Sequence, residues 1–386
     1  MGIYSIYQSP KMSVSKINQS NKTLTFTLSN TNVSIANALR RIILSEISTV
    51  VFRTTPYEKN RVKITVNTTR MNNEIIKQRM SCIPIYITED MDIQIEDYIV
   101  EVDKKNETNK IDYVTTKDFR VKNIKTKEYL NDDDRNKIFP PDDITGDYIE
   151  LVRLRPKVSD NAVEQLSFTA TFDYGTAKED GAFNVISTCS YAAAQDKMEN
   201  VRLKWDEKAA LMEKDGATKD EIKMAERDWY LLEAKRIIKD DEFNFIVESV
   251  GPYKNTDIVY KATRIMTRKL EKLKIDLEKK SEAMIKKSSS TIPNCYDIIL
   301  EGEDYTLGKV VEFMVYNKFY NNGVTYCGFI KPHPHIPISI IRIGFADATN
   351  EMSVVSMLST IADDAISIYD KISKSFQSGN SEEKKE

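Results

Sequence analysis

The sequence is poor in cysteine and has no Cys-x-x-Cys pair. Its 386 residues include four cysteines, Cys82, Cys189, Cys295 and Cys327, which lie far apart along the chain. Small disulfide-stabilised domains need dense cysteine patterns. The sequence therefore predicts no disulfide framework and indicates a reducing compartment.

Long hydrophobic runs are also missing. No apolar stretch reaches the roughly 18 residues that predict a membrane-spanning helix. The N-terminal stretch MGIYSIYQSP lacks a basic segment followed by a long apolar run, so it does not have the pattern of a signal peptide. The sequence thus predicts no association with a membrane.

Residues and motifs for catalysis are scarce. The chain has only two histidines, His333 and His335, so histidine-based acid–base catalysis elsewhere in the chain is excluded. No phosphate-binding Gly-x-x-x-x-Gly-Lys-Ser/Thr motif is present. The sequence predicts no catalytic residue and no cofactor.

Two groups of residues are weak candidates for a metal site. Three adjacent aspartates, 132–134, lie in a polar segment that is typical of a solvated turn. Cys327, His333 and His335 lie close in sequence, but prolines separate them and no fourth ligand is evident. We predict no metal, although a weak site at Cys327, His333 and His335 stays open.

The charges are nearly balanced. Lys and Arg number 56, Asp and Glu number 59, and the formal net charge is -3. DNA-binding surfaces carry excess positive charge, so we predict little direct contact with DNA. A hydrophobic content of 41% in 386 residues is typical of a globular chain with two or three domains.

The N-terminal part predicts a strand, a helix, and later a second strand and helix. Residues 22–28 alternate in polarity, as in a strand. The helix that follows carries an apolar face and has Asn32 and Ser34 as candidate N-caps. That face comprises Ile35, Leu39, Ile42, Ile43 and Ile47. A strand over 243–250 and a long helix capped by Thr256 complete this half, and the apolar side of the long helix comprises Ile258, Ala262, Ile265, Met266, Leu273 and Leu277.

The C-terminal part repeats this element order. A polar linker over 286–294 precedes a strand over 298–300, a helix over 305–319, and strands over 324–329 and 338–343. A last helix begins near Asn350. Its apolar face comprises Val355, Leu358, Ala362, Ala365 and Ile372. The repeated order indicates two related halves, covering residues 12–51 with 187–285 and residues 295–374, followed by a disordered tail over 375–386.

Two insertions lengthen the first half. Residues 52–186 predict an inserted β-rich domain, with late strands over 148–154 and 166–172. Residues 191–240 predict a charged helical hairpin, interrupted at Gly216 and restarted by a capping box at Thr218. The hairpin also fits a solvated insertion without a binding role, and its role stays open.

Two motifs resemble one family. Residues 32–41 read NVSIANALRR, and residues 303–311 read EDYTLGKVV. They resemble the paired alpha-type assembly subunits of cellular RNA polymerases: bacterial alpha, archaeal D and L, and the third- and eleventh-largest subunits of eukaryotic RNA polymerase II. Residues 78–85, 174–180, 245–259 and 328–335 are similar to further elements of the family, in the family's order.

The sequence departs from the family at three places. Gln78 and Tyr305 replace histidines that are typical of the family. Many third-subunit relatives carry a zinc loop with four cysteines, whereas no cysteine lies between Cys82 and Cys189 here. We therefore predict no zinc in that loop.

The resemblance implies an α+β fold in which two alpha-type halves pair as a pseudo-twofold unit. The residues that it places at the internal interface are Ile35, Leu39, Ile42, Ile43, Ile265, Leu307, Val311 and Leu358. It places Arg40 and Arg41 against the second-largest polymerase subunit, where guanidinium groups can bind carboxylates or carbonyls. Because both halves are present in one chain, we predict no homo-oligomer.

The function that the resemblance implies is a non-catalytic assembly subunit of a DNA-directed RNA polymerase. Its expected partners are the largest and second-largest subunits and the small tenth- and twelfth-subunit-like proteins. Such fusions are typical of nucleocytoplasmic large DNA viruses, including mimivirus-like ones, which predicts a place in the virion and the host cytoplasm. If the polymerase is not viral, the expected location of the chain is the nucleus. The alternatives are a stand-alone nucleic-acid-binding or protein-interaction module and an enzyme with an unrecognised site.

Overall fold

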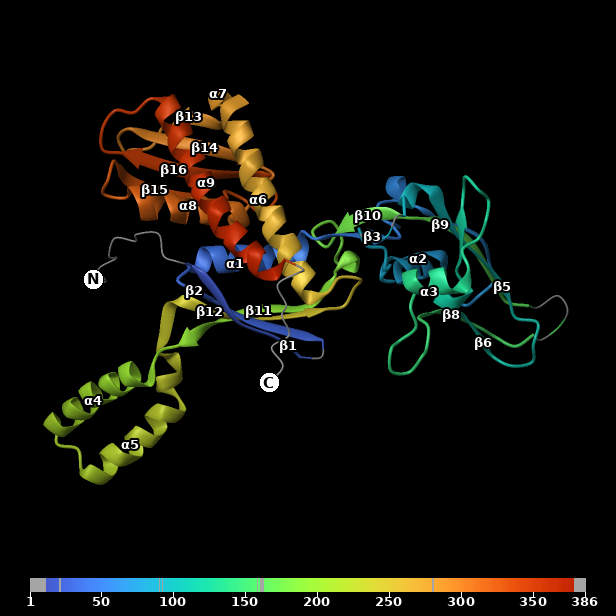
Figure 1. Cartoon of the computed structure of the whole chain (residues 1–386), viewed down its shortest axis with the longest axis horizontal. Coiled ribbons are helices and arrows are strands. Elements are labelled where there is room, and N and C mark those ends of the chain that lie inside the picture. Colours follow the sequence, from blue (N-terminus) through green and yellow to red (C-terminus); the bar gives the residue numbers. More distant parts are fainter. Residues whose placement is uncertain are drawn as a thin grey trace. The chain divides into compact units, whose positions relative to one another are not determined.

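The computed structural model describes residues 12–20, 22–89, 91, 93–157, 159, 163–279 and 281–377. The chain forms two compact units. The first unit takes its residues from Met1–Ile42, Thr188–Val247 and Val259–Glu386, and the second from Ile43–Ser187 and Glu248–Ile258. Both helices and strands contribute to each unit, so the predicted α+β class is confirmed (Figure 1).

The N-terminal half of the first unit is built on a four-stranded sheet. Its strands are β1 (Ser13–Ser20), β2 (Thr23–Ser29), β12 (Ile238–Ser249) and β11 (Ile186–Gln195), in the order β1-β2-β12-β11. Alternate side chains of β2 and β12 are buried, as expected for a sheet with one covered face. On that face Phe26 stacks on Phe245, with ring centroids 4.8 Å apart.

Two helices accompany this sheet, α1 (Val33–Ser45) and α6 (Asn255–Lys279). The amide of Ser34 donates to Oδ1 of Asn32 at 2.8 Å, so Asn32 is the cap of α1 and Ser34 lies inside the helix. Thr256 also lies inside a helix, because α6 begins one residue earlier, at Asn255. The prediction that Thr256 caps α6 is therefore wrong.

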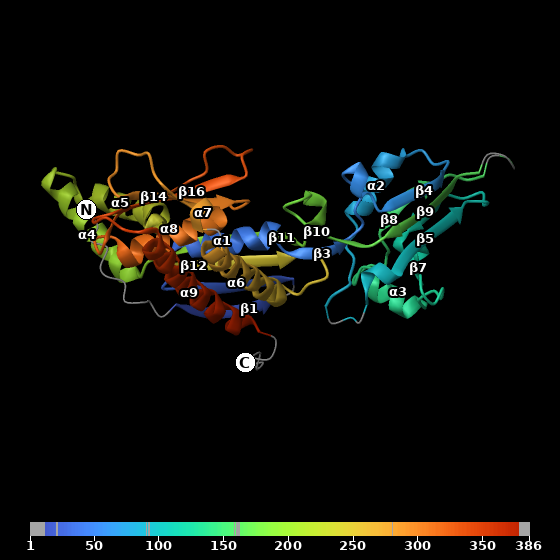
Figure 2. The same ribbon diagram turned by 90° about the horizontal axis from the view of Figure 1, so that it is seen from above.

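The C-terminal half has the same plan. Strands β13 (Ile285–Lys287), β14 (Cys295–Glu301), β16 (Ile338–Phe345) and β15 (Val324–Ile330) form a sheet in that order. Helix α8 (Tyr305–Phe319) has the predicted bounds, and α9 (Glu351–Phe376) begins after the predicted Asn350. A short helix, α7 (Ser281–Met284), precedes β13. Figures 1 and 2 show α6 and α9 side by side, running across both sheets of the first unit.

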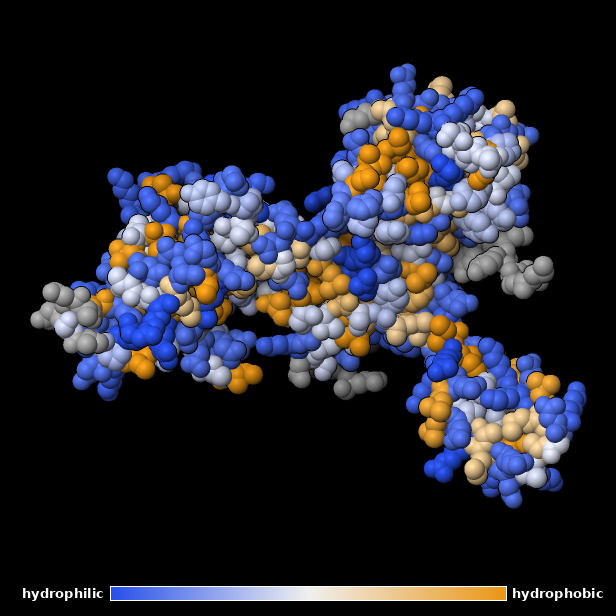
Figure 3. All heavy atoms as spheres, turned by 180° about the vertical axis from the view of Figure 1, so that it is seen from behind, coloured by the Kyte–Doolittle hydropathy of each residue, from blue (hydrophilic) through white to orange (hydrophobic). Residues whose placement is uncertain are grey.

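The outer face of the C-terminal sheet is partly apolar. Ile299 on β14, Ile340 on β16 and Ile330 on β15 are directly opposite one another in the register. Ile330 is 55% exposed. Figure 3 views the molecule from behind and shows apolar side chains gathered over this sheet.

Helix α8 lies so close to β15 that one position requires glycine. A Cβ atom built on Gly308 would lie 2.0 Å from Cε2 of Phe329, far inside contact distance. Gly308 is buried in the second turn of α8, so the helix cannot move away without opening the core beneath it.

We therefore expect Gly308→Ala to destabilise the chain by about 2 kcal/mol, although alanine is the better helix former. Urea unfolding followed by circular dichroism measures this loss. Gly181→Ala is the control, since a Cβ atom there meets nothing within 4 Å. Unchanged stability of Gly308→Ala would show that α8 and β15 are farther apart.

The second unit is mainly β. Its larger sheet has the order β4-β9-β5-β7, and two-stranded sheets pair β6 with β8 and β10 with β3. The strands are β3 (Ser48–Val51), β4 (Val62–Asn67), β5 (Tyr98–Lys105), β6 (Asp112–Thr115), β7 (Arg120–Asn123), β8 (Glu150–Leu154), β9 (Gln165–Thr171) and β10 (Asp173–Thr176). The helices are α2 (Asn73–Ser81) and α3 (Asp132–Ile138). Phe52 joins the core by ring contacts with Phe119, Phe139 and Phe172.

One segment of this unit differs from its prediction. The sequence predicts a solvated turn around the three aspartates 132–134, but residues 132–138 form α3. Oδ1 of Asn131 accepts from the amide of Asp134 at 2.8 Å and so caps the helix. The three aspartates then occupy the first turn, where the helix dipole favours negative charge.

The helical hairpin consists of α4 (Met198–Lys214) and α5 (Lys219–Leu231). The capping box of Thr218 and Glu221 is confirmed. Trp205 and Trp229 pack between the helices, with ring centroids 5.9 Å apart. The predicted span of 191–240 is too long, because 191–195 belong to β11 and 238–240 to β12, where sheet pairing overrides helix propensity.

Three further predictions need correction in the C-terminal half. Lys286 and Lys287 of the predicted linker lie in β13, paired with β14. Val354 is buried on α9, whereas Val355 is only half-buried. Phe376 of the predicted disordered tail ends α9 and is buried, and residues 378–386 lie outside the described part of the chain.

Five short 3-10 helices complete the described residues: η1 (Tyr57–Lys59), η2 (Ile95–Asp97), η3 (Thr116–Asp118), η4 (Gly181–Phe183) and η5 (Glu233–Arg236). Within the described part of the chain, no helix combines the length and the apolar character needed to cross a membrane.

Candidate interface between the two halves

The last helix of the chain packs into the N-terminal half. Tyr369 on α9 is fully buried, and its hydroxyl donates to the carbonyl of Ile35 on α1 at 3.4 Å. Burial raises the pKa of Tyr369 far above its usual value, so the hydroxyl stays protonated. At the last residue of α9, Phe376 meets the edge of Phe26 on β2, with centroids 5.0 Å apart.

Arg41 lies at the junction of the two halves. Its Nη2 lies 2.9 Å from Oδ2 of Asp304, and its Nε donates to Oγ1 of Thr306 at 2.8 Å. Asp304 also caps α8, because its Oδ1 accepts from the amide of Thr306 at 2.8 Å. The guanidinium of Arg41 therefore holds the start of α8 against α1.

Arg40 makes a different contact, although it is the neighbour of Arg41. Its Nε and Nη2 donate to Oδ1 of Asn37 at 3.0 and 2.9 Å, within α1 itself. The structure thus separates the two predicted arginines. Arg41 joins the halves, while Arg40 is half-buried beside its own helix.

Three ion pairs connect α6 of the N-terminal half to the C-terminal half. Lys269 Nζ lies 3.0 Å from Oε2 of Glu303, in the least exposed of the three pairs. The other two pairs are Lys274 Nζ with Asp363 Oδ1 at 2.6 Å and Arg264 Nη1 with Asp370 Oδ1 at 3.6 Å. The pairs with Asp363 and Asp370 place α6 against α9 over several turns, and the pair with Glu303 places it against the start of α8.

Most residues predicted for the internal interface are buried. The buried set is Ile35, Leu39, Ile42, Ile43, Leu307, Val311 and Leu358. Ile265 is only half-buried, because Ala262 and Met266 occupy the buried face of α6. Sequence reasoning missed Tyr369 and Phe376, although the i, i+3 and i+4 spacing of apolar residues continues through both.

A second polar cluster lies in the second unit around Arg53, which is 7% exposed. Its Nε lies 2.7 Å from Oδ2 of Asp173, its Nη1 lies 2.8 Å from Oε2 of Glu179, and its Nη2 donates to the carbonyl of Tyr174. Burial opposes the charge of Arg53, but the hydrogen bonds that its guanidinium donates to both carboxylates outweigh this effect and raise the guanidinium pKa. Because the guanidinium of Arg53 donates to groups of the same unit, the cluster connects β10 to the loop after β3.

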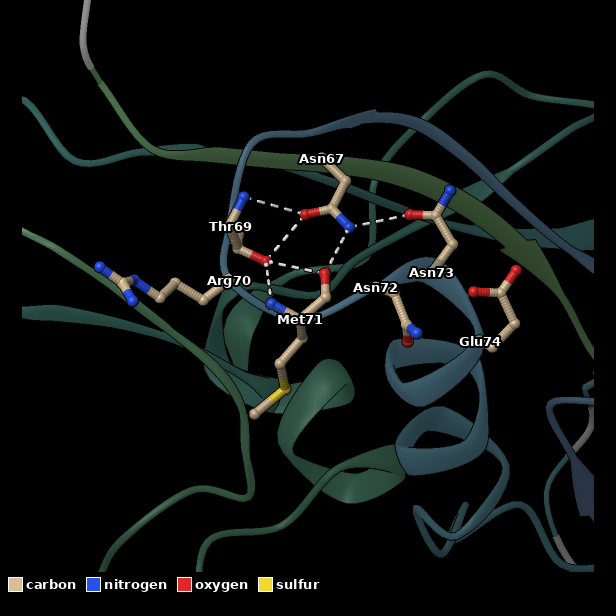
Figure 4. Close-up of a pocket in the computed structure, with 7 residues that line it drawn as sticks. All are labelled: Asn67, Thr69, Arg70, Met71, Asn72, Asn73 and Glu74. Carbon is tan, nitrogen blue, oxygen red and sulfur yellow. Dashed lines mark hydrogen bonds between the residues drawn. The ribbon is translucent and has the colours of Figure 1, made fainter.

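A surface hollow between β4 and α2 is lined by polar residues (Figure 4). The Asn67 amide donates to the carbonyl of Met71 and to Oδ1 of Asn73, both at 2.8 Å, and its Oδ1 accepts from the amide of Thr69 at 3.0 Å. These groups satisfy one another, and Arg70 extends away from them (Figure 4). The hollow is a hydrogen-bonded turn without an acid–base pair.

Two of the three candidate metal ligands near the C-terminus, Cys327 and His333, already have hydrogen-bond partners. Burial raises the pKa of the Cys327 thiol to about 12, and its sulfur donates to the carbonyl of Glu312 at 3.8 Å. His333 Nδ1 accepts from the amide of His335 at 3.1 Å. Across the described residues, no group of three or more His, Cys, Asp or Glu is arranged to hold a metal ion.

Both halves match known protein families. Residues 25–270 match a family described as "RNA polymerase Rpb3/Rpb11 dimerisation domain". Residues 295–375 match a second family with the same description. The first match spans the N-terminal half together with the second unit, and the second covers β14 to α9. The two halves that Arg41 and Tyr369 join are therefore both similar to this domain.

Individual relatives match over short segments. The chain is 45% identical over 60 residues to "DNA-directed RNA polymerases IV and V subunit 3B" of Arabidopsis thaliana, covering 16% of this chain and 17% of that protein. It is 38% identical over 68 residues to "DNA-directed RNA polymerase II subunit RPB3" of Schizosaccharomyces pombe, covering 18% and 20%. The chain thus spans about a fifth of the length of these curated relatives.

Proposed function

Because the chain belongs to the RNA polymerase Rpb3/Rpb11 dimerisation-domain family and carries two such domains, we propose that it is a non-catalytic assembly subunit of a multi-subunit DNA-directed RNA polymerase. The observation that carries this proposal is the pairing of the N- and C-terminal halves within one compact unit, through Tyr369, Phe376 and Arg41. The paired domains would form one composite surface on which larger subunits assemble.

The partners that we propose are the second-largest subunit, the largest subunit and small tenth- and twelfth-subunit-like proteins. The near-balanced charge of the chain supports docking through proteins rather than through DNA. Since each domain already has its partner in the same chain, we propose that the subunit does not form homo-oligomers. The presence of both domains in one chain also supports the proposal of a viral enzyme, carried in the virion and used in the host cytoplasm.

Affinity purification of the tagged chain from its native source, followed by mass spectrometry, tests the assembly role. We expect two very large polymerase subunits in equal amount with the chain. Recovery of the chain without them would overturn the proposal and favour the alternative of a stand-alone binding module. Detection of the chain in purified virions tests the viral setting separately.

Arg40 and Arg41 provide a prediction about the docking surface. Replacing both with Ala is expected to weaken binding to the second-largest subunit by about 2 kcal/mol, in the range of interface arginines, without unfolding the chain. Binding of purified subunits by calorimetry measures this change. Unchanged affinity would remove both residues from the docking surface.

Single variants separate the two roles. Arg41→Ala also removes the contact with Asp304, so its effect includes a loss of thermal stability. Arg40→Ala leaves that contact in place and reports docking alone. Arg268→Ala, at an exposed position of α6, is the control for a general loss of positive charge.

A further inference from the structure

The four ion pairs described above between the two halves share one polarity. In each of the pairs described above, the cation comes from the N-terminal half and the anion from the C-terminal half. The cations are Arg41, Arg264, Lys269 and Lys274, and the anions are Asp304, Asp370, Glu303 and Asp363. A pairing of two identical halves would repeat every contact in both directions, because a twofold interface is self-complementary.

The helix caps show directly that the halves are not interchangeable. Asn32 caps α1 and Asp304 caps α8 through the same contact, a side-chain oxygen that accepts from the amide two residues later. Arg41 lies nine residues after Asn32, and Phe313 lies nine residues after Asp304. The positions equivalent to Asp304 and Arg41 in the other half are thus Asn32 and Phe313, which are both uncharged.

The long helices carry the same asymmetry. Helix α6 has seven Lys or Arg and four Asp or Glu, whereas α9 has two Lys and four Asp or Glu. In a pair of two N-terminal halves, a second α6 would take the place of α9. Lys274 and Arg264 would then lose Asp363 and Asp370 and face a helix of like charge.

We propose that this one-way charge pattern makes the N-terminal half select the C-terminal half and reject a copy of itself. Charge complementarity contributes more to the choice of partner than to the strength of binding. Lys269 and Glu303 contribute most, because their side chains are 15% and 17% exposed and are the least screened by water. The inference rests on the proposed function only in that the paired halves form the assembly platform.

A charge swap in the full chain tests the proposal. One triple variant is Arg264→Glu, Lys269→Glu and Lys274→Glu, and the other is Glu303→Lys, Asp363→Lys and Asp370→Lys. Asp304 is left unchanged, because it also caps α8. Each triple places like charges together and is expected to lower Tm by roughly 5–10 °C. The chain carrying all six changes restores opposite charges and is expected to regain most of that loss.

Refolding the two triple variants together gives a second readout. In the mixture, the N-terminal half of either chain finds opposite charges on the C-terminal half of the other. We expect a particle of two chains by native mass spectrometry in the mixture only, which 1 M salt weakens by screening. Each triple refolded alone is the matched control.

Two results would overturn the proposal. One is a decrease in Tm of the chain with all six changes that equals the sum of the decreases in the two triple variants. That result would mean that the oppositely charged sites do not interact. The other is a mixture that yields no more two-chain particle than either triple alone. Neither readout involves a polymerase subunit, so failure here is distinguishable from failure of the proposed function.

Discussion

Leu39→Asp is expected to unfold the first unit at physiological temperature. Leu39 is fully buried at the centre of α1, where Ile35 and Ile42 are buried on either side of it. Introducing a carboxylate there removes apolar contacts and leaves a charge without a partner, at a cost of about 5 kcal/mol. Because domains are stable by about 5–15 kcal/mol, this loss is a large share of the total. Thermal unfolding followed by circular dichroism measures it.

Val33→Asp is the matched control on the same helix. Val33 begins α1 and is 47% exposed. A carboxylate in the first turn is favoured by the helix dipole, so we expect a change below about 1 kcal/mol. A Leu39→Asp chain that melts with the parent would mean that α1 does not present this face to the core.

Tyr369→Ala is expected to give the second large loss. The side chain of Tyr369 is fully buried and connects α9 to α1 through Ile35. Truncating a large buried aromatic residue costs about 3–5 kcal/mol, from lost contacts and the cavity left behind. The variant should unfold at lower urea concentration, and the midpoint shift measures the difference.

Two further variants divide this loss into its parts. Tyr369→Phe keeps the ring and removes only the hydroxyl, so we expect a loss of about 1 kcal/mol. Tyr57→Ala removes a tyrosine side chain that is 84% exposed and should change stability little. If Tyr369→Ala behaved like Tyr57→Ala, α9 would not be packed into the N-terminal half.

The elements that sequence reasoning located well carry their own boundary signals. Helix α8 was predicted with its observed bounds, because Asp304 caps its start and an apolar pattern runs to Phe319. Asn350 marked the start of α9 in the same way. The capping box at Thr218 located α5. In each case the signal lies within a few residues of the boundary that it sets.

The elements that were predicted wrongly depend on contacts with residues far away in the sequence. Strand β13 has only three residues, two of them lysines, and it exists because β14 pairs with it. The end of α9 was assigned to a tail because its residues are mostly polar, yet Phe376 is held by Phe26 far away in sequence. Local pattern does not contain such information.

The candidate interface was predictable only in part. The apolar face of α1 follows from helical periodicity, so its burial was expected. The partner of Arg41 was not, because Asp304 lies 263 residues away and nothing near either residue indicates the other. The resemblance directed attention to Arg41 as a docking residue, whereas its observed contacts are inside the chain.

The pairing of β13 with β14 has a thermodynamic consequence for the whole unit. The segment that connects the halves is itself part of the C-terminal sheet, so little slack separates α6 from the domain that it contacts. Two separate chains dissociate on dilution by mass action, whereas opening within one chain is a first-order equilibrium that dilution does not shift. A short connection gives an effective concentration on the order of millimolar. The halves therefore stay paired even when the concentration of the protein is very low.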